Sequence, residues 1–486
     1  MLKHGGPHME LVARKNELML LHRALEKRES QFIAVYGRRR VGKTYLVREA
    51  YEGRFCFTHT GLYGRSRKEQ IGAFTHSLLK AGFSSGTVTP GNWMDAFDLL
   101  EKMIEHSHLS QKIIFLDEIS WMDTQNSDFL AALEHFWNAF ASARKDIVLV
   151  ICSSATSWVM DRVLHSRGGF HNRLTLSLHL QPFTLSEVEM YVHSLGVSLT
   201  RMQILEGYMT LGGIPYYWSH LEKGMSIDQY IDYLFFRKGA LLKDEFSYLF
   251  QSLFAKPEPY MSIIQALSQK KKGLTRNELL KATGLKSSQG TTRKLEELEN
   301  CDFIRIYTAY GNRKGTLYQL IDPFVLFYYH FLDHRSMDPQ FWMHQANSPA
   351  TNTWKGLAFE LVCLLHVEEM KAKMGIASVL TEVFSFSVEK NLEKGIQGSQ
   401  IDLVMKRADR VTNLFEMKYS QDRYMVTGSD DEALRRKRSD YQRVMGTRNT
   451  TYITLVTPYG VIQNSYAGNL DSVLTGDDLF YNTNPA

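Results

Sequence analysis

The chain has 486 residues, and its 57 lysines and arginines exceed its 52 acidic residues by five. Hydrophobic residues make up 44% and charged residues 22%, which excludes a fibrous or largely disordered chain. No apolar run approaches the ~18 residues of a membrane span, and residues 1–15 lack the apolar core of a signal peptide. The four cysteines form no CxxC pair, which argues against a disulfide framework or a zinc site. We therefore expect a cytoplasmic protein without membrane contact.

The first third of the chain alternates short apolar stretches with helical ones. Strands are predicted at Gln31–Tyr36, Ile113–Leu116 and Ile147–Cys152, and a helix is predicted at Trp93–His106. Strands separated by helices are typical of a parallel sheet with helices on both faces. The pattern therefore predicts an α/β core over residues 1–181.

The first predicted strand leads into a glycine-rich loop that fits the pattern GxxxxGK[ST]. Glycines let the backbone N–H groups point toward phosphate oxygens, and the N-terminus of the following helix adds a favourable dipole. Lys43 would reach the β- and γ-phosphates of ATP, and the Thr44 hydroxyl would bind Mg²⁺. The predicted nucleotide contacts in this segment are Gly37, Arg38, Arg39, Arg40, Val41, Gly42, Lys43, Thr44 and Tyr45. The alternative is a glycine loop that matches the pattern by chance.

Two carboxylates follow the second predicted strand, at the edge where α/β sheets place their ligands. Asp117 would hold the Mg²⁺ shell, and Glu118 would polarise the attacking water. The alternative is a pair of solvated acids at a strand end. Ser153, after the next strand, would sense the γ-phosphate or instead cap the following turn.

These motifs resemble the prokaryotic AAA+-like, STAND-related P-loop ATPases, whose phosphate loop reads much like Val35–Thr44. Leu11–Leu18 is similar to the N-terminal box of that family, and Gly212–Pro215 is similar to the motif with which its lid monitors the nucleotide. The resemblance implies a helical lid over residues 182–257. It also implies that Arg173 is an arginine finger offered to a neighbouring subunit of a homo-oligomer, with a plain surface arginine as the alternative.

The next segment, residues 258–335, is locally basic. Between Tyr260 and Lys314 there are eleven lysines and arginines and five acidic residues. Its predicted elements are helices at Tyr260–Leu267, Leu274–Leu280 and Ser287–Asn300, then strands at Phe303–Tyr307 and Leu317–Ile321. This order is typical of a winged helix, with Arg313 and Lys314 in the wing. The charge favours DNA binding, and a protein-binding or interdomain module is the alternative.

Residues near the C-terminal end suggest a second chemical site. Antiparallel pairing of two strand-like stretches about Asp409 places Asp402 opposite Glu416, and alternation returns Lys418 to the same face. Facing carboxylates need a compensating positive charge, which Mg²⁺ or Mn²⁺ would supply. A nearby lysine can orient or deprotonate water, so the arrangement suits metal-assisted phosphodiester hydrolysis.

The spacing D-x13-E-x-K resembles the PD-(D/E)xK nuclease superfamily, with Ile401 in place of the proline of that name. The resemblance implies a nuclease-like α/β domain over residues 336–486. It also implies that Glu360, on a preceding helix, joins Asp402 and Glu416 as a metal ligand. The alternatives are a degenerate nuclease-like fold and a hairpin held by salt bridges.

The sequence therefore predicts four successive domains. They are a P-loop ATPase core (1–181), a helical lid (182–257), a winged-helix domain (258–335) and a nuclease-like domain (336–486). The predicted function is Mg²⁺-dependent ATP hydrolysis by a protein that acts on DNA, with a nuclease site controlled by the nucleotide state. The predicted catalytic residues are Lys43, Glu118, Arg173, Asp402, Glu416 and Lys418. The alternative is an ATP-driven, STAND-like switch that binds DNA or a protein partner without cleaving it.

Overall fold

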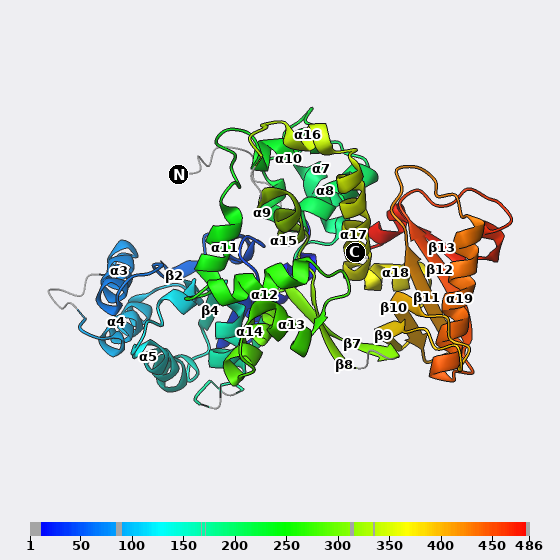
Figure 1. Ribbon diagram of the computed structural model, residues 1–486. Helices are drawn as coiled ribbons and strands as arrows, with labels where there is room; N and C mark the ends of the chain where they lie inside the picture. The colour runs from blue at the N-terminus through cyan, green and yellow to red at the C-terminus, as the bar shows by residue number, and fades with distance from the viewer. Residues whose placement is uncertain are drawn as a thin grey trace. The chain divides into compact units, whose positions relative to one another are not determined.

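The computed structural model describes residues 11–83, 90–166, 168–170, 172–311, 315–333 and 336–482. The chain divides into two compact units. The first holds the residues up to Pro182 and the short segment 252–255, and the second holds 183–251 and the residues from Lys256 onward. Each unit is described by itself, with the element labels of Figure 1.

The first unit is built on a five-stranded parallel sheet in the order β2-β3-β4-β1-β5. Its strands are β1 (Gln31–Tyr36), β2 (Phe55–Thr60), β3 (Lys112–Asp117), β4 (Ile147–Ser153) and β5 (Leu176–His179). Its helices are α1 (Lys15–Glu26), α2 (Lys43–Ala50), α3 (Arg67–Lys80), α4 (Trp93–His106), η1 (Ile119–Trp121), α5 (Phe129–His135), η2 (Phe136–Ala141), α6 (Thr156–Val159) and η3 (Met160–Leu164). The predicted α/β class is confirmed.

Burial explains why the three central strands read as continuous apolar runs. Every residue of β1, β3 and β4 is buried, as expected for a parallel sheet covered on both faces. Helix α4 contributes Trp93 and Phe97, whose rings lie 4.8 Å from Phe129 and 5.4 Å from Phe136. Because the strands are parallel, the C-terminal ends of β1, β3 and β4 meet at one edge of the sheet.

The second unit begins with a group of helices, as predicted for this segment. They are α7 (Leu185–Ser194), α8 (Arg201–Leu211), α9 (Pro215–Trp218), α10 (Ile227–Phe235) and most of α11 (Glu245–Leu253). Gly212 ends α8 with a φ of +61°, and a Cβ on Gly213 would collide with the carbonyl oxygen of Phe183. The backbone N–H of Phe183 donates to the Gly213 carbonyl at 2.7 Å. Both glycines are therefore required by the backbone path.

The basic segment folds in the predicted order of helices and hairpin. It contains α12 (Glu258–Ser268), β6 (Leu274–Thr275), α13 (Arg276–Thr283), α14 (Gln289–Asn300), β7 (Ile304–Gly311) and β8 (Gly315–Leu320). Thr275 and Glu278 form a capping box at the start of α13. Ser288 caps α14, one residue after the predicted start of that helix. Arg313 and Lys314, predicted in the wing, lie outside the described residues.

The rest of the second unit continues through helices into strands. The helices are α15 (Pro323–Phe327), η4 (Tyr328–Leu332), α16 (Phe341–Gln345), α17 (Pro349–Leu365), α18 (Val367–Lys373), α19 (Gly428–Met445), η5 (Ala467–Asn469) and η6 (Gly476–Phe480). The strands are β9 (Thr381–Val388), β10 (Ser399–Arg407), β11 (Val411–Met417), β12 (Thr450–Thr457) and β13 (Ser472–Thr475).

One eight-stranded sheet, in the order β13-β12-β11-β10-β9-β7-β8-β6, runs through this unit. Its continuity depends on β7 and β9, which pair in parallel at Ala309–Gly311 and Ser385–Ser387. The hairpin of the basic segment and the C-terminal strands therefore share one sheet, which crosses the domain limit predicted at residue 336. In the same sheet Leu403 lies opposite Phe415, which is the register predicted for the β10–β11 hairpin.

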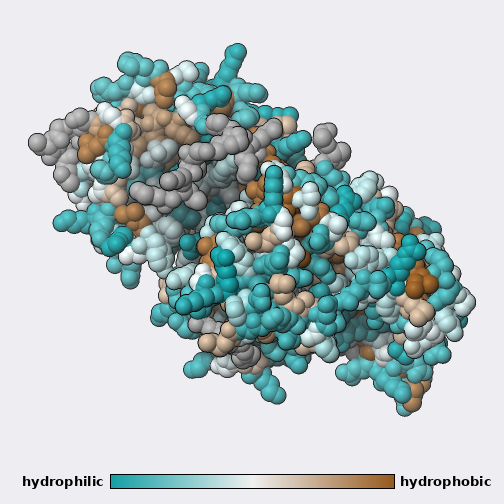
Figure 2. Space-filling model, turned by 90° about the horizontal axis from the view of Figure 1, so that it is seen from above, coloured by the Kyte–Doolittle hydropathy of each residue, from teal (hydrophilic) through white to brown (hydrophobic). Residues whose placement is uncertain are grey.

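On the face in Figure 2, hydrophilic residues predominate and hydrophobic ones gather only in small groups. Within the described ranges, no helix is both long and apolar enough to span a bilayer.

Candidate functional site

The predicted phosphate loop connects β1 to α2 and depends on backbone conformations that favour glycine. Gly37 and Gly42 have φ values of +142° and +97°, and Gly42 is the N-cap of α2. A Cβ on Gly37 would collide with the carbonyl oxygen of Leu180. Arg40 also has a positive φ, of +71°. The loop is therefore held in a curve that a chain without these glycines would adopt only at a cost.

Lys43 is 5% exposed at the first position of α2. Its ammonium group donates to the carbonyl oxygens of Gly37 and Arg38, both at 2.8 Å. The Lys43 side chain therefore folds over the loop and is hydrogen-bonded to the loop backbone. The loop lies at the N-terminus of α2, where the helix dipole favours a bound anion.

Thr44 and Asp117 meet where β3 and α2 adjoin. The Thr44 hydroxyl lies 3.0 and 3.2 Å from the two carboxylate oxygens of Asp117 and donates to them. Burial, and then the charge of Glu118, raise the pKa of Asp117, whereas the Thr44 hydrogen bond opposes this shift. A hydroxyl beside a buried carboxylate is a donor set of hard oxygens, which fits Mg²⁺.

Glu118 is held by a residue that the sequence analysis did not select. The backbone N–H and hydroxyl of Ser154 donate to its carboxylate at 3.1 and 2.6 Å. Ser153, which was selected, instead donates to the Ser120 hydroxyl at 3.0 Å. Its role in sensing the γ-phosphate stays a prediction. Strands β3 and β4 are parallel neighbours in the sheet. A polar residue that directly follows β4, such as Ser154, could therefore be expected to lie near Glu118, which directly follows β3.

Two further predicted residues lie away from these contacts. Arg173 is exposed, three residues before β5. Tyr45 is 47% exposed on α2. The arginine-finger role of Arg173 stays a prediction.

Comparison with known proteins agrees with this geometry. Residues 11–221 match a family model described as an ATPase domain predominantly from Archaea. An uncharacterised protein of Methanocaldococcus jannaschii is 25% identical over 327 residues, which cover 66% of this chain and 68% of that protein. This part of the chain is a P-loop ATPase domain.

Similar solved structures include two archaeal proteins. A Walker-type ATPase of Pyrococcus abyssi is 17% identical, with a TM-score of 0.48 over 68% of this chain and 99% of that one. The ORC2 protein of Aeropyrum pernix is 13% identical, with a TM-score of 0.43 over 74% of this chain and 96% of that one. The ATPase family implies a bound nucleotide and usually Mg²⁺, for which Lys43, Thr44 and Asp117 provide fitting groups.

Beyond the ATPase domain, the predicted carboxylates Glu360 and Asp402 share one ammonium group. Glu360 lies on α17 and is 4% exposed, and Asp402 lies on β10. Nζ of Lys271, from the loop between α12 and β6, contacts Oε2 of Glu360 and lies 3.3 Å from Oδ2 of Asp402. Burial and the charge of Asp402 raise the pKa of Glu360, whereas Lys271 opposes this shift. Lys271 therefore supplies the opposing positive charge beside the buried Glu360.

Glu416 and Lys418, at the end of β11, form a second pair. Nζ of Lys418 lies 3.1 Å from Oε1 of Glu416, and Lys437 on α19 contacts Oε2. The charge of Glu416 also contributes to the raised pKa of Glu360, so the two pairs lie within electrostatic range. Within the described ranges, no group of three or more histidine, cysteine, aspartate or glutamate side chains is arranged to hold a metal ion.

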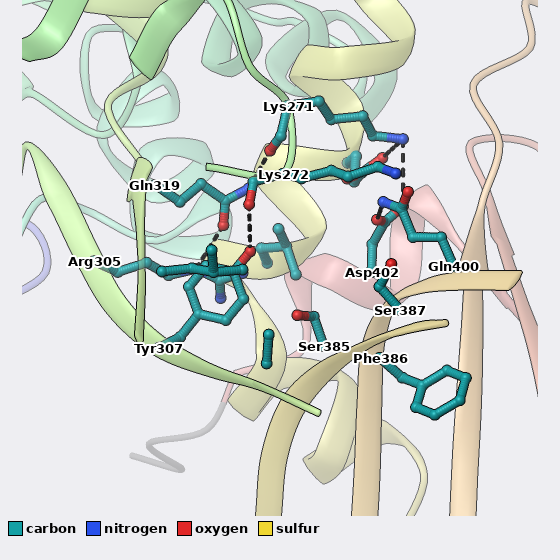
Figure 3. A pocket seen from close by; sticks show the side chains of 14 residues that line it. Lys271, Lys272, Arg305, Tyr307, Gln319, Ser385, Phe386, Ser387, Gln400 and Asp402 are labelled. Carbon is teal, nitrogen blue, oxygen red and sulfur yellow. Dashed lines mark hydrogen bonds and ion pairs between the residues drawn. The ribbon is translucent and has the colours of Figure 1, made fainter. Parts of the chain in front are cut away.

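A polar pocket adjoins this cluster (Figure 3). One wall comes from β7 and β8, where the Arg305 guanidinium donates to Gln319 at 2.8 Å and stacks over the Tyr307 ring at 4.6 Å. The opposite wall comes from β9 and β10 and includes Ser387 and Asp402. The pocket thus sets a basic wall against an acidic one.

Lys271 and Lys437 are the residues that the sequence analysis missed here. Both lie in basic runs, Lys270–Lys272 and Arg435–Arg438. From the sequence these runs indicate a local positive charge but do not indicate which carboxylates they contact. Ion pairs between residues more than a hundred positions apart follow from the eight-stranded sheet, which no local pattern shows.

Proposed function

We propose that this ATP-hydrolysing protein acts on DNA and carries a metal-dependent nuclease site that its nucleotide state controls. The observation that supports the proposal is the meeting of two predicted carboxylates, Glu360 and Asp402, at one ammonium group beside a pocket. Glu416 and Lys418 form a separate ion pair, and the charge of Glu416 acts on Glu360. A perturbed carboxyl group beside a pocket, such as that of Glu360, is typical of functional sites.

In the ATPase domain, the residues around the loop would divide the work of phosphoryl transfer. Lys43 would leave its carbonyl partners and neutralise phosphate charge, and Thr44 and Asp117 would hold Mg²⁺. Mg²⁺, when bound, supplies charge neutralisation for the phosphate oxygens. Glu118 would orient the attacking water, and Ser154 fixes the Glu118 carboxylate for that role.

At the C-terminal site, Glu360, Asp402 and Glu416 would hold Mg²⁺ or Mn²⁺ only after leaving their present ammonium partners and drawing together. Lys418 would orient or deprotonate the attacking water. The metal, when bound, supplies a Lewis acid for a phosphodiester. The basic wall with Arg305 would attract a negatively charged backbone, and a metal held by the carboxylates would offset their repulsion of it. The local surplus of basic residues in this segment supports DNA as the polymer.

The test is Mg²⁺- or Mn²⁺-dependent plasmid nicking, measured beside ATP hydrolysis for Asp402→Asn. We expect nicking to fall by about a hundredfold or more, because a metal-binding carboxylate is lost, and ATP hydrolysis to persist. The matched control is Asp409→Asn, which changes an exposed aspartate in the turn of the same hairpin. Equal nicking by both variants would contradict the nuclease assignment.

A second function is favoured by one specific observation, namely that each of the three carboxyl groups already has an ammonium partner. Such a site suits a nucleotide-driven switch that binds DNA or a protein partner without cleaving it. In that case the wild-type protein would hydrolyse ATP and leave the plasmid intact with either metal. Assembly through Arg173 would then show as ATP-dependent oligomer formation in light scattering.

A further inference from the structure

The carboxylates of the proposed nuclease site are held by lysines from outside the D-x13-E-x-K pattern. Lys271 contacts Glu360 and Asp402, and Lys437 contacts Glu416. Only Lys418, the third ammonium partner, belongs to the pattern itself. Lys272 and Arg305 line the same pocket as Glu360 and Asp402, so positive charge already surrounds these carboxylates before any metal arrives.

Lys271 occupies the position that matters most for a metal ion. Its Nζ lies against oxygens of both Glu360 and Asp402, two groups from different elements that a divalent cation would bridge. Its side chain remains 40% exposed, whereas that of Glu360 is 5% exposed. The lysine thus reaches inward from the surface, and the carboxylate cannot turn outward to meet a cation elsewhere.

An ammonium and a divalent cation cannot share these oxygens. At ordinary coordination distances a divalent ion takes carboxylate oxygens at ~2.1 Å, and an ammonium left beside it would face strong repulsion. Binding of a metal between Glu360 and Asp402 therefore requires Lys271 to leave. The two states differ in the position of the loop between α12 and β6, which belongs to the basic segment.

We propose that Lys271 is an internal competitor for the divalent metal, which keeps the C-terminal carboxylate site closed until the Lys270–Lys272 loop withdraws. This inference rests on the proposed function, since it concerns the regulation of the same site. Movement of the loop and binding of the metal are then thermodynamically coupled. Any partner that draws the loop away would raise the affinity of the site for metal.

The direct test is Mn²⁺ binding, followed by electron paramagnetic resonance of the free ion, in nucleotide-free protein. Every variant also carries Asp117→Asn, so that the ATPase domain does not contribute a metal site. Lys271→Met is expected to bind Mn²⁺ about tenfold or more tightly than its parent, because the competing ammonium is gone. Adding Asp402→Asn should abolish that gain. Lys270→Met, the exposed neighbour, is the matched control and should bind as the parent does.

The outcomes separate this inference from the nuclease assignment. Unchanged Mn²⁺ affinity in Lys271→Met would overturn the competition, even if the parent cleaves DNA. Tight Mn²⁺ binding by Lys271→Met would support the competition. If the Lys271→Met protein with Asp117 intact still failed to nick plasmid, the nuclease assignment would be contradicted while the competition stood. A gain that survives Asp402→Asn would place the metal elsewhere and also overturn the inference.

A second measurement uses the unaltered protein, so the inference remains testable if Lys271→Met fails to fold. The rate at which an acetylating reagent modifies Lys271 is followed by mass spectrometry with and without saturating Mn²⁺. Release of the side chain should raise its rate several-fold relative to that of Lys270. An unchanged ratio would show that the metal leaves Lys271 in place and would overturn the proposal.

Discussion

At the scale of single residues, glycines have opposite consequences according to what surrounds them. A Cβ on Gly213 would meet the backbone of Phe183, and the adjoining Gly212 has a positive φ. Gly356, inside α17, has open space where a Cβ would lie. The resemblance to a lid motif selected Gly213 for a role near a nucleotide, and the structure adds a packing role against the backbone of Phe183.

We predict opposite effects for alanine at these two positions. Gly213→Ala should lower the free energy of unfolding by about 3 kcal/mol or more, because backbone atoms must move to admit the methyl group. Gly356→Ala should raise it by about 1 kcal/mol, since alanine favours a helix interior. Denaturant unfolding of the two variants would measure both changes. A stable Gly213→Ala protein would show that the backbone can shift at no cost.

At the scale of elements, His366 shows how one side chain ends a helix. It separates α17 from α18 and is the cap residue of both. Nδ1 of His366 donates to the Val362 carbonyl at 2.8 Å, and Nε2 accepts from the backbone N–H of Leu185 at 3.0 Å. The ring is therefore neutral, and burial lowers its pKa to about 4.

This histidine predicts a pH dependence of stability. As pH falls from about 6.5 toward 4, the unfolded chain binds a proton that the folded ring does not, so stability decreases and levels off below pH 4. The loss should reach roughly 3 kcal/mol. Replacing His366 with glutamine should remove this part of the pH dependence in denaturant unfolding, and glutamine at exposed His108 should not. An unchanged profile in the first variant would contradict a neutral, buried ring.

The same elements show how much the sequence could predict. Strand β1 and helix α4 have the predicted bounds, because each combines a clear apolar period with a distinct boundary residue. The β10–β11 register followed from one turn. The helix break at His366 involves a hydrogen bond from Leu185, and Glu118 is held by Ser154. Both partners belong to other parts of the chain, so local periodicity does not predict these contacts.

At the scale of the whole molecule, the phosphate loop is the point from which nucleotide control would begin. Lys43→Ala should abolish ATP hydrolysis and weaken ATP binding by about tenfold or more, because the ammonium that neutralises phosphate charge is lost. Any ATP dependence of plasmid nicking should disappear with it. Calorimetry and phosphate release would measure the first two effects. Lys80→Ala, at an exposed helix end, is the control. If ATP-dependent nicking persisted in Lys43→Ala, the phosphate loop would not control the C-terminal site.

The parallel pairing of β7 with β9 also determines how this protein can be dissected. A chain truncated after residue 335 would lose β9 and leave one side of β7 with unpaired N–H and C=O groups at Ala309–Gly311. A fragment that starts at residue 336 would leave the matching edge of β9 bare at Ser385–Ser387. Bare strand edges attract other chains, so such fragments would tend to aggregate. The contributions of the two parts are therefore better separated by point substitutions in the intact chain.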